Sequence, residues 1–282
     1  MTLEIESTAA RLTRQAKRLA LVGGRLAQWQ LNALEFNEPR RASEPLPHAL
    51  CSTRVSLLGG KGHPVFEAGK RHNVALAAPA FDGLRLSSTS AFSFWKTLGR
   101  VTEARGYRHG MELSGGCIVP ALGGGLCLLA RVFFQAAVSS GLTIFERHGH
   151  SMHAVSPPAG VPLGFDATVL WPYIDLRFGP QLGEVHVACR VKDDALIVTF
   201  TGSHPLQHRI EVSEIDSRQV VGPEGRVLFN RLLRRRFDGA GAPVSADVVA
   251  VNRTRWLSRV EQGRSCLTCA ETACRSRVTV PA

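Results

Sequence analysis

The sequence predicts an α+β protein, with helices in the first half of the chain and strands in the second. Two stretches with helical character, at residues 8–33 and 126–138, precede the strand-rich part. Beyond residue 165 the chain is a series of short β-type runs separated by Pro, Gly, Asp or Lys. We therefore expect an N-terminal helix, a cysteine-bearing helix packed on an antiparallel sheet, and a β-rich C-terminal half.

The size and composition of the chain predict a substantial folded core. Its 282 residues are 44% hydrophobic and 20% charged, which disfavours disorder. The longest apolar stretch near the start, residues 19–24, is too short to span a bilayer, and the first residues, Met-Thr-Leu-Glu-Ile-Glu, lack a secretory pattern. We expect no transmembrane segment and a cytoplasmic protein. Any contact with a membrane would be peripheral.

The net charge of +11 predicts an anionic partner surface, which could be nucleic acid, an acidic membrane face or a cell-wall polymer or precursor. Nucleic acid is disfavoured because no helix-turn-helix, zinc-finger or aromatic-basic RNA-reading pattern is found. The densest basic run, residues 234–236, lies in an apolar frame, and we interpret it as a solvated face of a basic protein.

The first element, a helix over residues 8–33, carries apolar side chains at intervals that favour one face and basic side chains on the others. Such a helix could lie on an anionic membrane or dock on its own domain. A polar connector follows at residues 37–47. We divide the chain into an N-terminal helical and connector region (1–69), a core domain (70–200) and a β-rich C-terminal extension with a cysteine-containing tail (201–282).

The strands of the core and the extension are predicted from β-type runs and their turn signals. A first short strand, residues 115–119, should end at Pro120, and Gly141 should end the helix that starts at residue 126. The remaining strands are expected at residues 142–145, 167–171, 174–178, 184–191, 195–201, 208–213 and 248–260.

The best candidate for a reactive centre is Cys127, which follows Gly123, Gly124 and Gly125 in the first turn of the second predicted helix. Glycines permit positive φ angles and leave the thiol uncrowded, and the unpaired amides at a helix N-terminus favour a thiolate. A buried, inert cysteine is the alternative interpretation.

A thiol nucleophile needs a base and a group that orients the base, and the chain supplies candidates in order. His150 follows the strand after the cysteine helix, and Asp166 enters the next strand. This is the order of roles in papain-like and transglutaminase-like thiol enzymes, so a core of that kind is expected. Alternatively, a cluster of His148, His150 and His153 could bind a metal, and Asp166 could cap a turn.

Several blocks of this sequence resemble the VanW family, named for a protein encoded with some vancomycin-resistance operons. The similarity covers roughly residues 70–200. The blocks are His72-Asn73-Val74-Ala75-Leu76-Ala77-Ala78, Phe92-Ser93-Phe94-Trp95, Gly106-Tyr107 with Gly110, Gly123-Gly124-Gly125-Leu126-Cys127, Glu146-Arg147-His148-Gly149-His150, Asp166-Ala167-Thr168-Val169 and Ile174-Asp175-Leu176.

The resemblance implies a protein of cell-envelope or glycopeptide-resistance context. Family members typically carry the Cys, His and Asp that align with Cys127, His150 and Asp166, which would make this chain a thiol enzyme acting on an amide or peptide of a cell-wall precursor. A binding or accessory protein on the same fold, or a metal-binding protein, is the alternative. The family usually has polar residues after the cysteine, where this chain has Leu128, Leu129 and Ala130. The supporting residues implied by these blocks are Gly123, Gly124, Gly125, Glu146, Arg147, His148 and Thr168.

A second cysteine group lies in the tail, at Cys266, Cys269 and Cys274. The first two form a CxxC pair that suits zinc, with the third as a further ligand. A redox or disulfide pair and plain thiols are the alternatives. Zinc is thus the one cofactor that the sequence suggests.

Overall fold

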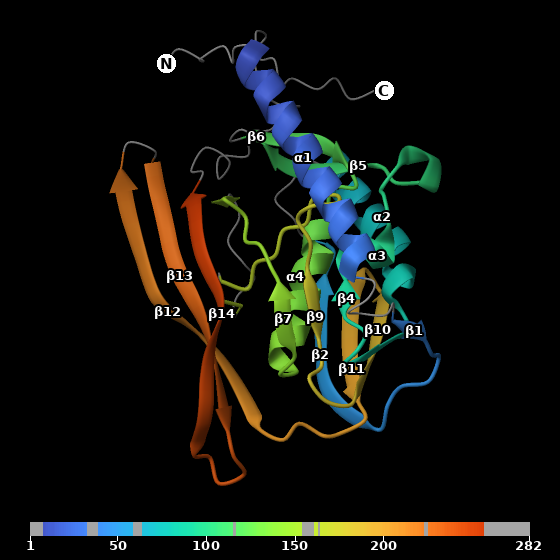
Figure 1. The fold of residues 1–282 in the computed structure, drawn as a ribbon, viewed down its shortest axis with the longest axis vertical. Helices are drawn as coiled ribbons and strands as arrows, with labels where there is room; N and C mark the ends of the chain where they lie inside the picture. The colour runs from blue at the N-terminus through green and yellow to red at the C-terminus, as the bar shows by residue number, and fades with distance from the viewer. Residues whose placement is uncertain are drawn as a thin grey trace.

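A computed structural model gives the fold of this chain (Figure 1). It describes residues 8–32, 39–58, 64–114, 117–153, 161–162, 164–222 and 225–256. The order of helices and strands confirms the predicted α+β class, with mostly antiparallel sheets and a C-terminal half made of strands.

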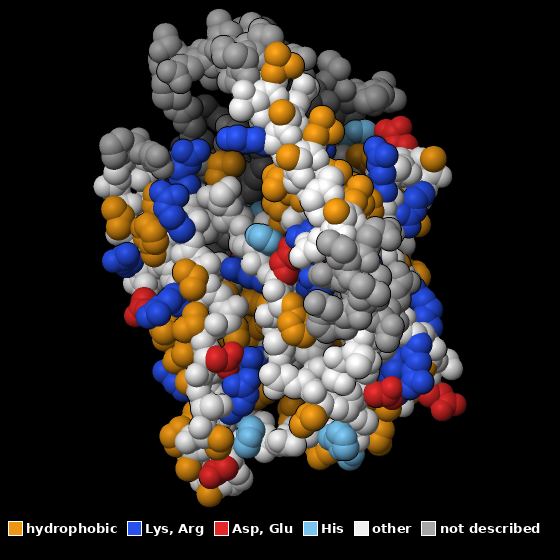
Figure 2. All heavy atoms as spheres, viewed as in Figure 1, with side chains coloured by type: hydrophobic (Ala, Val, Ile, Leu, Met, Phe, Trp, Pro, Cys, Tyr) orange, Lys and Arg blue, Asp and Glu red, His pale blue; other side chains and the backbone are white. Residues whose placement is uncertain are grey.

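The N-terminal helix α1 (Thr8–Asn32) forms where the sequence predicts it. Its C-terminal part is fixed to the core, because Arg25 pairs with Glu146 and Trp29 packs edge-on against Trp171, with ring centroids 5.6 Å apart. Much of the rest of its surface, including several leucines, faces solvent (Figure 2). No helix in the part of the chain that the structure describes is long and apolar enough to cross a membrane.

The main sheet has five antiparallel strands in the order β1-β3-β10-β11-β2. Its strands are β1 (Arg40–Arg41), β2 (His48–Ser56), β3 (Leu84–Ser87), β10 (Glu184–Lys192) and β11 (Ala195–Gly202). The hairpin β10–β11 turns at Asp193 and Asp194, which both take positive φ angles. Side chains alternate along these strands, so that one face of the sheet is apolar and buried.

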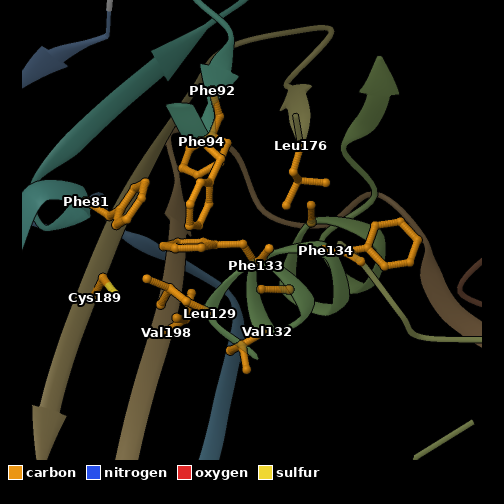
Figure 3. Close-up of a cluster of buried hydrophobic side chains, with 14 of the residues drawn as sticks. Phe81, Phe92, Phe94, Leu129, Val132, Phe133, Phe134, Leu176, Cys189 and Val198 are labelled. Atoms are coloured by element: carbon orange, nitrogen blue, oxygen red, sulfur yellow. The ribbon is translucent and has the colours of Figure 1, made fainter. Parts of the chain in front are cut away.

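Two helices, α2 (Pro64–Phe81) and α4 (Leu126–Ser139), pack on the main sheet and bury its apolar face. The centre of the core is aromatic: Phe133 of α4 contacts the rings of Phe81 and Phe92, whose centroids lie about 5 Å away (Figure 3). Since α4 is held along its whole length by this core, its N-terminus, where Cys127 lies, has a fixed position.

Two small sheets and two short helices complete the core. The hairpin β5–β6 precedes α4 in the chain, whereas the sheet β4-β9-β7 combines one strand from before α4 with two from after it. Their bounds are β4 (Phe92–Ser93), β5 (His109–Ser114), β6 (Cys117–Leu122), β7 (Thr143–Glu146) and β9 (Arg177–Gly179), with helices α3 (Phe94–Leu98) and η1 (Glu103–Arg105).

The C-terminal extension is a four-stranded sheet in the order β12-β13-β14-β8. Its strands are β8 (Met152–His153), β12 (Arg209–Gly222), β13 (Gly225–Phe237) and β14 (Pro243–Trp256). The long strands are antiparallel, whereas β8, which belongs to the core sequence, joins β14 in parallel. This sheet stands beside the core in Figure 1.

Some predictions about elements are wrong. Residues 167–171 and 174–178 do not form two strands; Leu170 and Ile174 make an isolated bridge, and only β9 follows. Pro120 does not end β6 but lies inside it, which a two-stranded hairpin tolerates because each strand has an open edge. The basic run is not a solvated face: the Arg234 side chain is 5% exposed, pairs with Asp247, and donates to the Leu142 carbonyl.

Candidate active site

The glycine run before α4 is required by a close backbone approach. A Cβ on Gly124 would lie 2.4 Å from the carbonyl carbon of Gly110, and Gly125 has a φ of 107°. The buried Asn73 of α2 fixes this approach, because its Nδ2 donates to the carbonyls of Arg108 and Gly124 at 2.8 and 3.0 Å. The loop therefore holds the first turn of α4 against the β5–β6 hairpin.

Cys127 is the second residue of α4 and is partly buried. Its Sγ lies 3.6 Å from the Thr168 hydroxyl and 3.8 Å from the Val169 carbonyl oxygen. These residues belong to the irregular segment after Asp166, so the segment that was predicted to be a strand instead wraps around the thiol.

His150 and Asp166 meet directly, although neither lies in a strand. The Nδ1 of His150 is 2.7 Å from one oxygen of Asp166, and the backbone N–H of His150 donates to the other oxygen at 2.6 Å. Asp166 is 7% exposed and His150 is 31% exposed at the side chain. This two-point contact orients the imidazole with Nδ1 toward Asp166, and His150 acts on Cys127 strongly enough for each group to shift the other's pKa.

The three groups change one another's protonation. Burial alone raises the pKa of the Cys127 thiol, but the hydrogen bond with His150 and its positive charge outweigh burial and leave the pKa below its ordinary value. Burial alone lowers the pKa of His150, whereas the hydrogen bonds with Asp166 and Cys127 raise it to about 10. Because the pKa of the Cys127 thiol is lowered and the pKa of His150 is raised, a thiolate–imidazolium pair is favoured at neutral pH.

Basic side chains and one acidic side chain surround this group. Arg147 donates from Nε to the Asp166 carbonyl at 2.5 Å and stacks over Phe134, and burial lowers its pKa to about 10. Burial also lowers the pKa of Arg131, which Asp166 partly restores. On β5, burial raises the pKa of Glu112, against the charge of His150.

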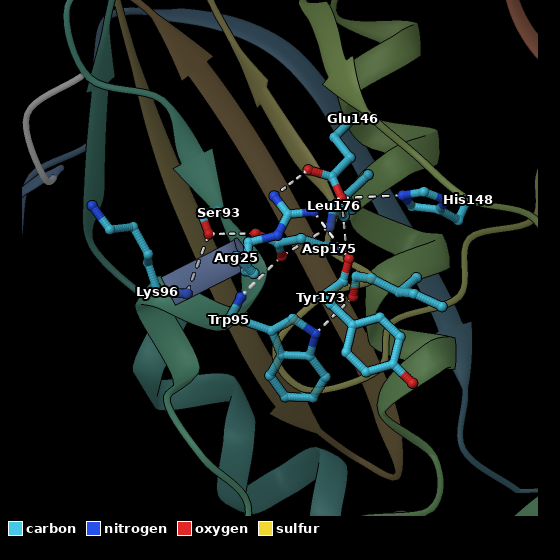
Figure 4. A network of polar contacts seen from close by, with 10 residues as sticks. Arg25, Ser93, Trp95, Lys96, Glu146, His148, Tyr173, Asp175 and Leu176 are labelled. Atoms are coloured by element: carbon cyan, nitrogen blue, oxygen red, sulfur yellow. Dashed lines mark hydrogen bonds and ion pairs between the residues drawn. The ribbon is translucent and has the colours of Figure 1, made fainter. Parts of the chain in front are cut away.

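Glu146 and His148 belong to a neighbouring network and do not reach the thiol. Glu146 binds the guanidinium of Arg25 through both oxygens and accepts from the Asp175 amide, and His148 Nε2 lies 3.1 Å from it (Figure 4). Burial alone raises the pKa of Glu146, but these bonds lower it to about 2. The network joins α1 to the strand that leads to His150.

Asp175 extends the network to α3. Its oxygens accept from the hydroxyl of Ser93 at 2.6 Å and from the amide of Trp95 at 3.1 Å, and burial raises its pKa to about 6. The predicted family block around Asp175 thus has a structural role that the sequence did not reveal.

The predicted supporting residues therefore separate into two groups. Gly123, Gly124, Gly125, Arg147 and Thr168 lie at or beside the thiol group, whereas Glu146 and His148 lie in the neighbouring network. Sequence reasoning missed the roles of Asn73 and Gly110, although both lie in the blocks that resemble the family. A buried asparagine in an apolar helix was the available signal.

The predicted metal sites gain no support. Among the described residues no three His, Cys, Asp or Glu side chains are grouped as metal ligands. His148 and His150 face different carboxylates, and the side chain of His153 is not described. Cys266, Cys269 and Cys274 lie outside the described residues, so zinc in the tail stays a prediction.

The fold and the site define an α+β protein that holds a cysteine, a histidine and an aspartate together at the start of a buried helix. The VanW family model, described as VanW like protein, matches residues 69–201. The match supports a VanW-family protein over residues 69–201, slightly under half of this chain.

Two curated relatives match about half of the chain. "Uncharacterized protein YoaR" of Bacillus subtilis is 30% identical over 142 residues, which are 50% of this chain and 46% of that protein. "Vancomycin B-type resistance protein VanW" of Enterococcus faecalis is 29% identical over 135 residues, 47% of this chain and 49% of that protein. This chain thus spans about half the length of these relatives. No solved structure matches it significantly.

Proposed function

We propose that this chain is a thiol enzyme in which Cys127 attacks the carbonyl of an amide or peptide. The observation that carries the proposal is the contact of His150 Nδ1 with Asp166 at 2.7 Å, beside a Cys127 thiol at the start of α4 whose pKa His150 lowers. A thiolate held by an imidazolium is already in the reactive form, and the carboxylate keeps the imidazole in the required tautomer.

The reaction would proceed by acyl transfer. The Cys127 thiolate forms a bond to the carbonyl carbon, the carbon–nitrogen bond breaks, and the His150 imidazolium gives its proton to the leaving amine. Water or an acceptor amine then attacks the thioester carbonyl carbon and transfers a proton to His150. The carbon–sulfur bond breaks, which releases the acid or the new amide and restores the Cys127 thiolate and the His150 imidazolium. Water would make the enzyme a hydrolase, and an amine would make it a transferase.

A donor for the oxyanion is available without a side chain. The amides of Leu126 and Leu128 donate to carbonyls of the glycine run at 3.3 and 3.0 Å. The amide of Cys127 itself is the first-turn donor that we assign to the oxyanion. It would compensate for the apolar residues that follow the cysteine in this chain.

The substrate class follows from the named relative. The Enterococcus faecalis protein is called a vancomycin B-type resistance protein, and the family resemblance implies a cell-envelope context. We therefore propose an amide or peptide of a cell-wall precursor, and a papain-like or transglutaminase-like arrangement of helix and sheet around the thiol.

The pH dependence of thiol alkylation tests the nucleophile. The structure describes three free thiols, and burial raises the pKa of Cys51 and Cys189, whereas the pKa of Cys127 is lowered. Iodoacetamide labelling followed by peptide mapping should therefore modify Cys127 rapidly at pH 7, with the other two as internal controls. If Cys127 reacts only at the alkaline pH where Cys51 reacts, the proposal is wrong.

Non-catalytic attachment to an anionic membrane is a second candidate function, favoured by helix α1. Leu12, Leu19 and Leu26 recur every seven residues and are exposed, and the basic Lys17 and Arg18 are exposed near them. This agrees with a helix that docks only through its C-terminal part and offers its outer surface to a partner.

Vesicle flotation tests this candidate. The protein should float with vesicles of phosphatidylglycerol and not with vesicles of phosphatidylcholine, and Leu19→Asp should reduce the bound fraction severalfold. Leu182→Asp, at another exposed leucine, is the matched control. Equal flotation of the wild type and the Leu19 variant would exclude α1 as the contact.

A further inference from the structure

A cleft of about 1290 Å³ lies between the core and the C-terminal sheet. Its lining comes from β7, from the loops before β10 and after β11, and from β13 and β14. Pockets for small molecules typically measure roughly 300–1,000 Å³, so this cleft suits a segment of a polymer. On the core side the lining ends at Glu146 and Arg147, shortly before His150 in the chain.

In the described part of the chain, two strands along the cleft have an edge that pairs with no other strand. β7 is the outer strand of its sheet, and within the described residues its pairing is with β9. β14 pairs with β13 on one side; on the other side, among the residues that the structure describes, only Arg255 and Trp256 pair, with β8. Residues 247–251 of β14 thus present backbone N–H and C=O groups toward the cleft, which is the template for another strand.

The short strand β8 shows how this edge accepts a strand. The Arg255 amide donates to the Ser151 carbonyl at 2.9 Å, and β8 continues beside Trp256. Because β8 lies on the chain that leaves β7, β7 and β14 are joined at this end and separate toward residues 143–147 (Figure 1). Residues of both strands line the cleft. No described strand takes, beside residues 247–251, the place that β8 takes beside residues 255–256.

The side chains around the cleft indicate the chemistry of its occupant. Exposed apolar side chains line it, and they are Phe145, Leu182, Leu206, Val248 and Val251. The charges of the lining balance, since its acidic residues are Glu146, Glu184 and Asp247 and its arginines are Arg147, Arg234 and Arg236, the last two of which both bind Asp247. Figure 2 shows hydrophobic side chains between the C-terminal sheet and the core, with a few charged ones among them. An uncharged ligand with alternate apolar groups fits this lining.

We propose that the cleft binds a peptide in extended conformation, which adds to the edge of β14 in line with β8. Strand addition uses the backbone for affinity and alternate side chains for specificity. The identification of this peptide as the substrate of Cys127 rests on the proposed function, whereas its binding does not.

The geometry at the joined end brings the end of such a peptide to the candidate active site. There the Thr254 hydroxyl donates to the His150 carbonyl at 3.1 Å, and Gly149 packs on Asn252. The Oδ1 of Asn252 is buried and has no hydrogen-bond partner among the described residues. Asn252 is not among the residues that line the cleft, so a peptide would have to extend past Arg147 to meet this acceptor.

Hydrogen exchange tests the binding with the full-length chain carrying Cys127→Ser, so that no reaction consumes the ligand. The probe is a pool of acetylated heptapeptides with Val, Leu or Phe at the second, fourth and sixth positions and Thr, Ser or Ala between them, at millimolar concentration. We expect the amides of residues 143–147 and 247–251 to become protected, while those of β12 stay unchanged. The same peptides with every second residue N-methylated should give no protection. They lack the N–H groups on one edge, with which a peptide strand would bond to β14.

A matched pair of variants locates the binding. Val248→Asp places a charge on the apolar lining and should weaken peptide binding about tenfold or more. Val221→Asp changes an exposed valine on the remote strand β12 and should leave it unchanged. The inference would be overturned if the Val248 and Val221 variants bound the peptides equally well. It would also be overturned if the N-methylated pool protected the same amides, if no peptide gave protection, or if protection changed with protein concentration and not with peptide.

The outcome is independent of the test of the nucleophile. If the peptides protect the cleft amides but Cys127 proves unreactive, the peptide-binding cleft is supported and the thiol-enzyme proposal is wrong. If Cys127 is reactive but the peptides protect no cleft amides, the thiol-enzyme proposal is supported and the cleft is not its peptide site.

Discussion

Replacing Asp166 by asparagine should raise the pH at which Cys127 becomes reactive. The amide has the shape of the carboxylate but no charge, so it no longer stabilises the imidazolium of His150. The imidazolium in turn stabilises the Cys127 thiolate, and the thiol pKa must therefore rise when the imidazolium becomes weaker. The effect passes from Asp166 to Cys127 through one histidine ring.

The size of the effect follows from the pKa of His150. Its pKa is raised from 6.5 to about 10 by Asp166 and Cys127 together, against burial. Since a tenfold change in protonation is worth about 1.36 kcal/mol, this rise corresponds to about 5 kcal/mol, an upper bound because the ring is partly exposed to solvent. If Asp166 supplies a half of it, the pH midpoint of Cys127 alkylation should rise by about one to two pH units.

The assay is the initial rate of iodoacetamide alkylation at Cys127 between pH 4 and pH 10, followed by mass spectrometry in the wild type and the variant. Glu112→Gln is the control, since Glu112 also lies in the field of His150 but makes no hydrogen bond to it. Its profile should stay close to that of the wild type. An unchanged profile for Asp166→Asn, in a variant whose far-ultraviolet spectrum is native, would refute the coupling.

Three further variants probe the frame of the site by chemical denaturation. Asn73→Ala should reduce the free energy of unfolding by about 2–4 kcal/mol, because it leaves the Gly124 carbonyl and neighbouring groups unpaired, and a loss below 1 kcal/mol would contradict that role. Gly124→Ala should destabilise the chain by at least about 2 kcal/mol and slow Cys127 alkylation, since its Cβ meets the backbone of Gly110; native stability would show that the loop can move. Glu146→Gln should cost up to about 3 kcal/mol at neutral pH. Because the folded pKa is depressed, that stability is present above about pH 4.5 and is lost as the pH falls toward 2, so the two unfolding curves should converge in acid; a constant difference would contradict the ion pair.

The sequence predicted the elements whose signals are local. The helix at Leu126–Ser139 and the turn at Gly141 follow from an apolar run between glycines, and β10 and β11 follow from alternation. The strand predicted at residues 167–171 failed because β-type residues were also suited to an extended segment around the thiol. Strand β13 was not predicted, because its arginines interrupt the apolar pattern, and one of them, Arg234, is buried by pairing with Asp247.

By itself, the sequence determined the order Cys127, His150, Asp166 and the place of the thiol at a helix start, because both depend on neighbouring residues. Only the tertiary structure decided that His150 pairs with Asp166, that Glu146 and His148 belong to a different network, and that a cleft ending at Arg147 lies between two strand edges. These features depend on contacts between segments far apart in the chain. Protonation states and strand edges arise from such contacts, which a local pattern does not contain.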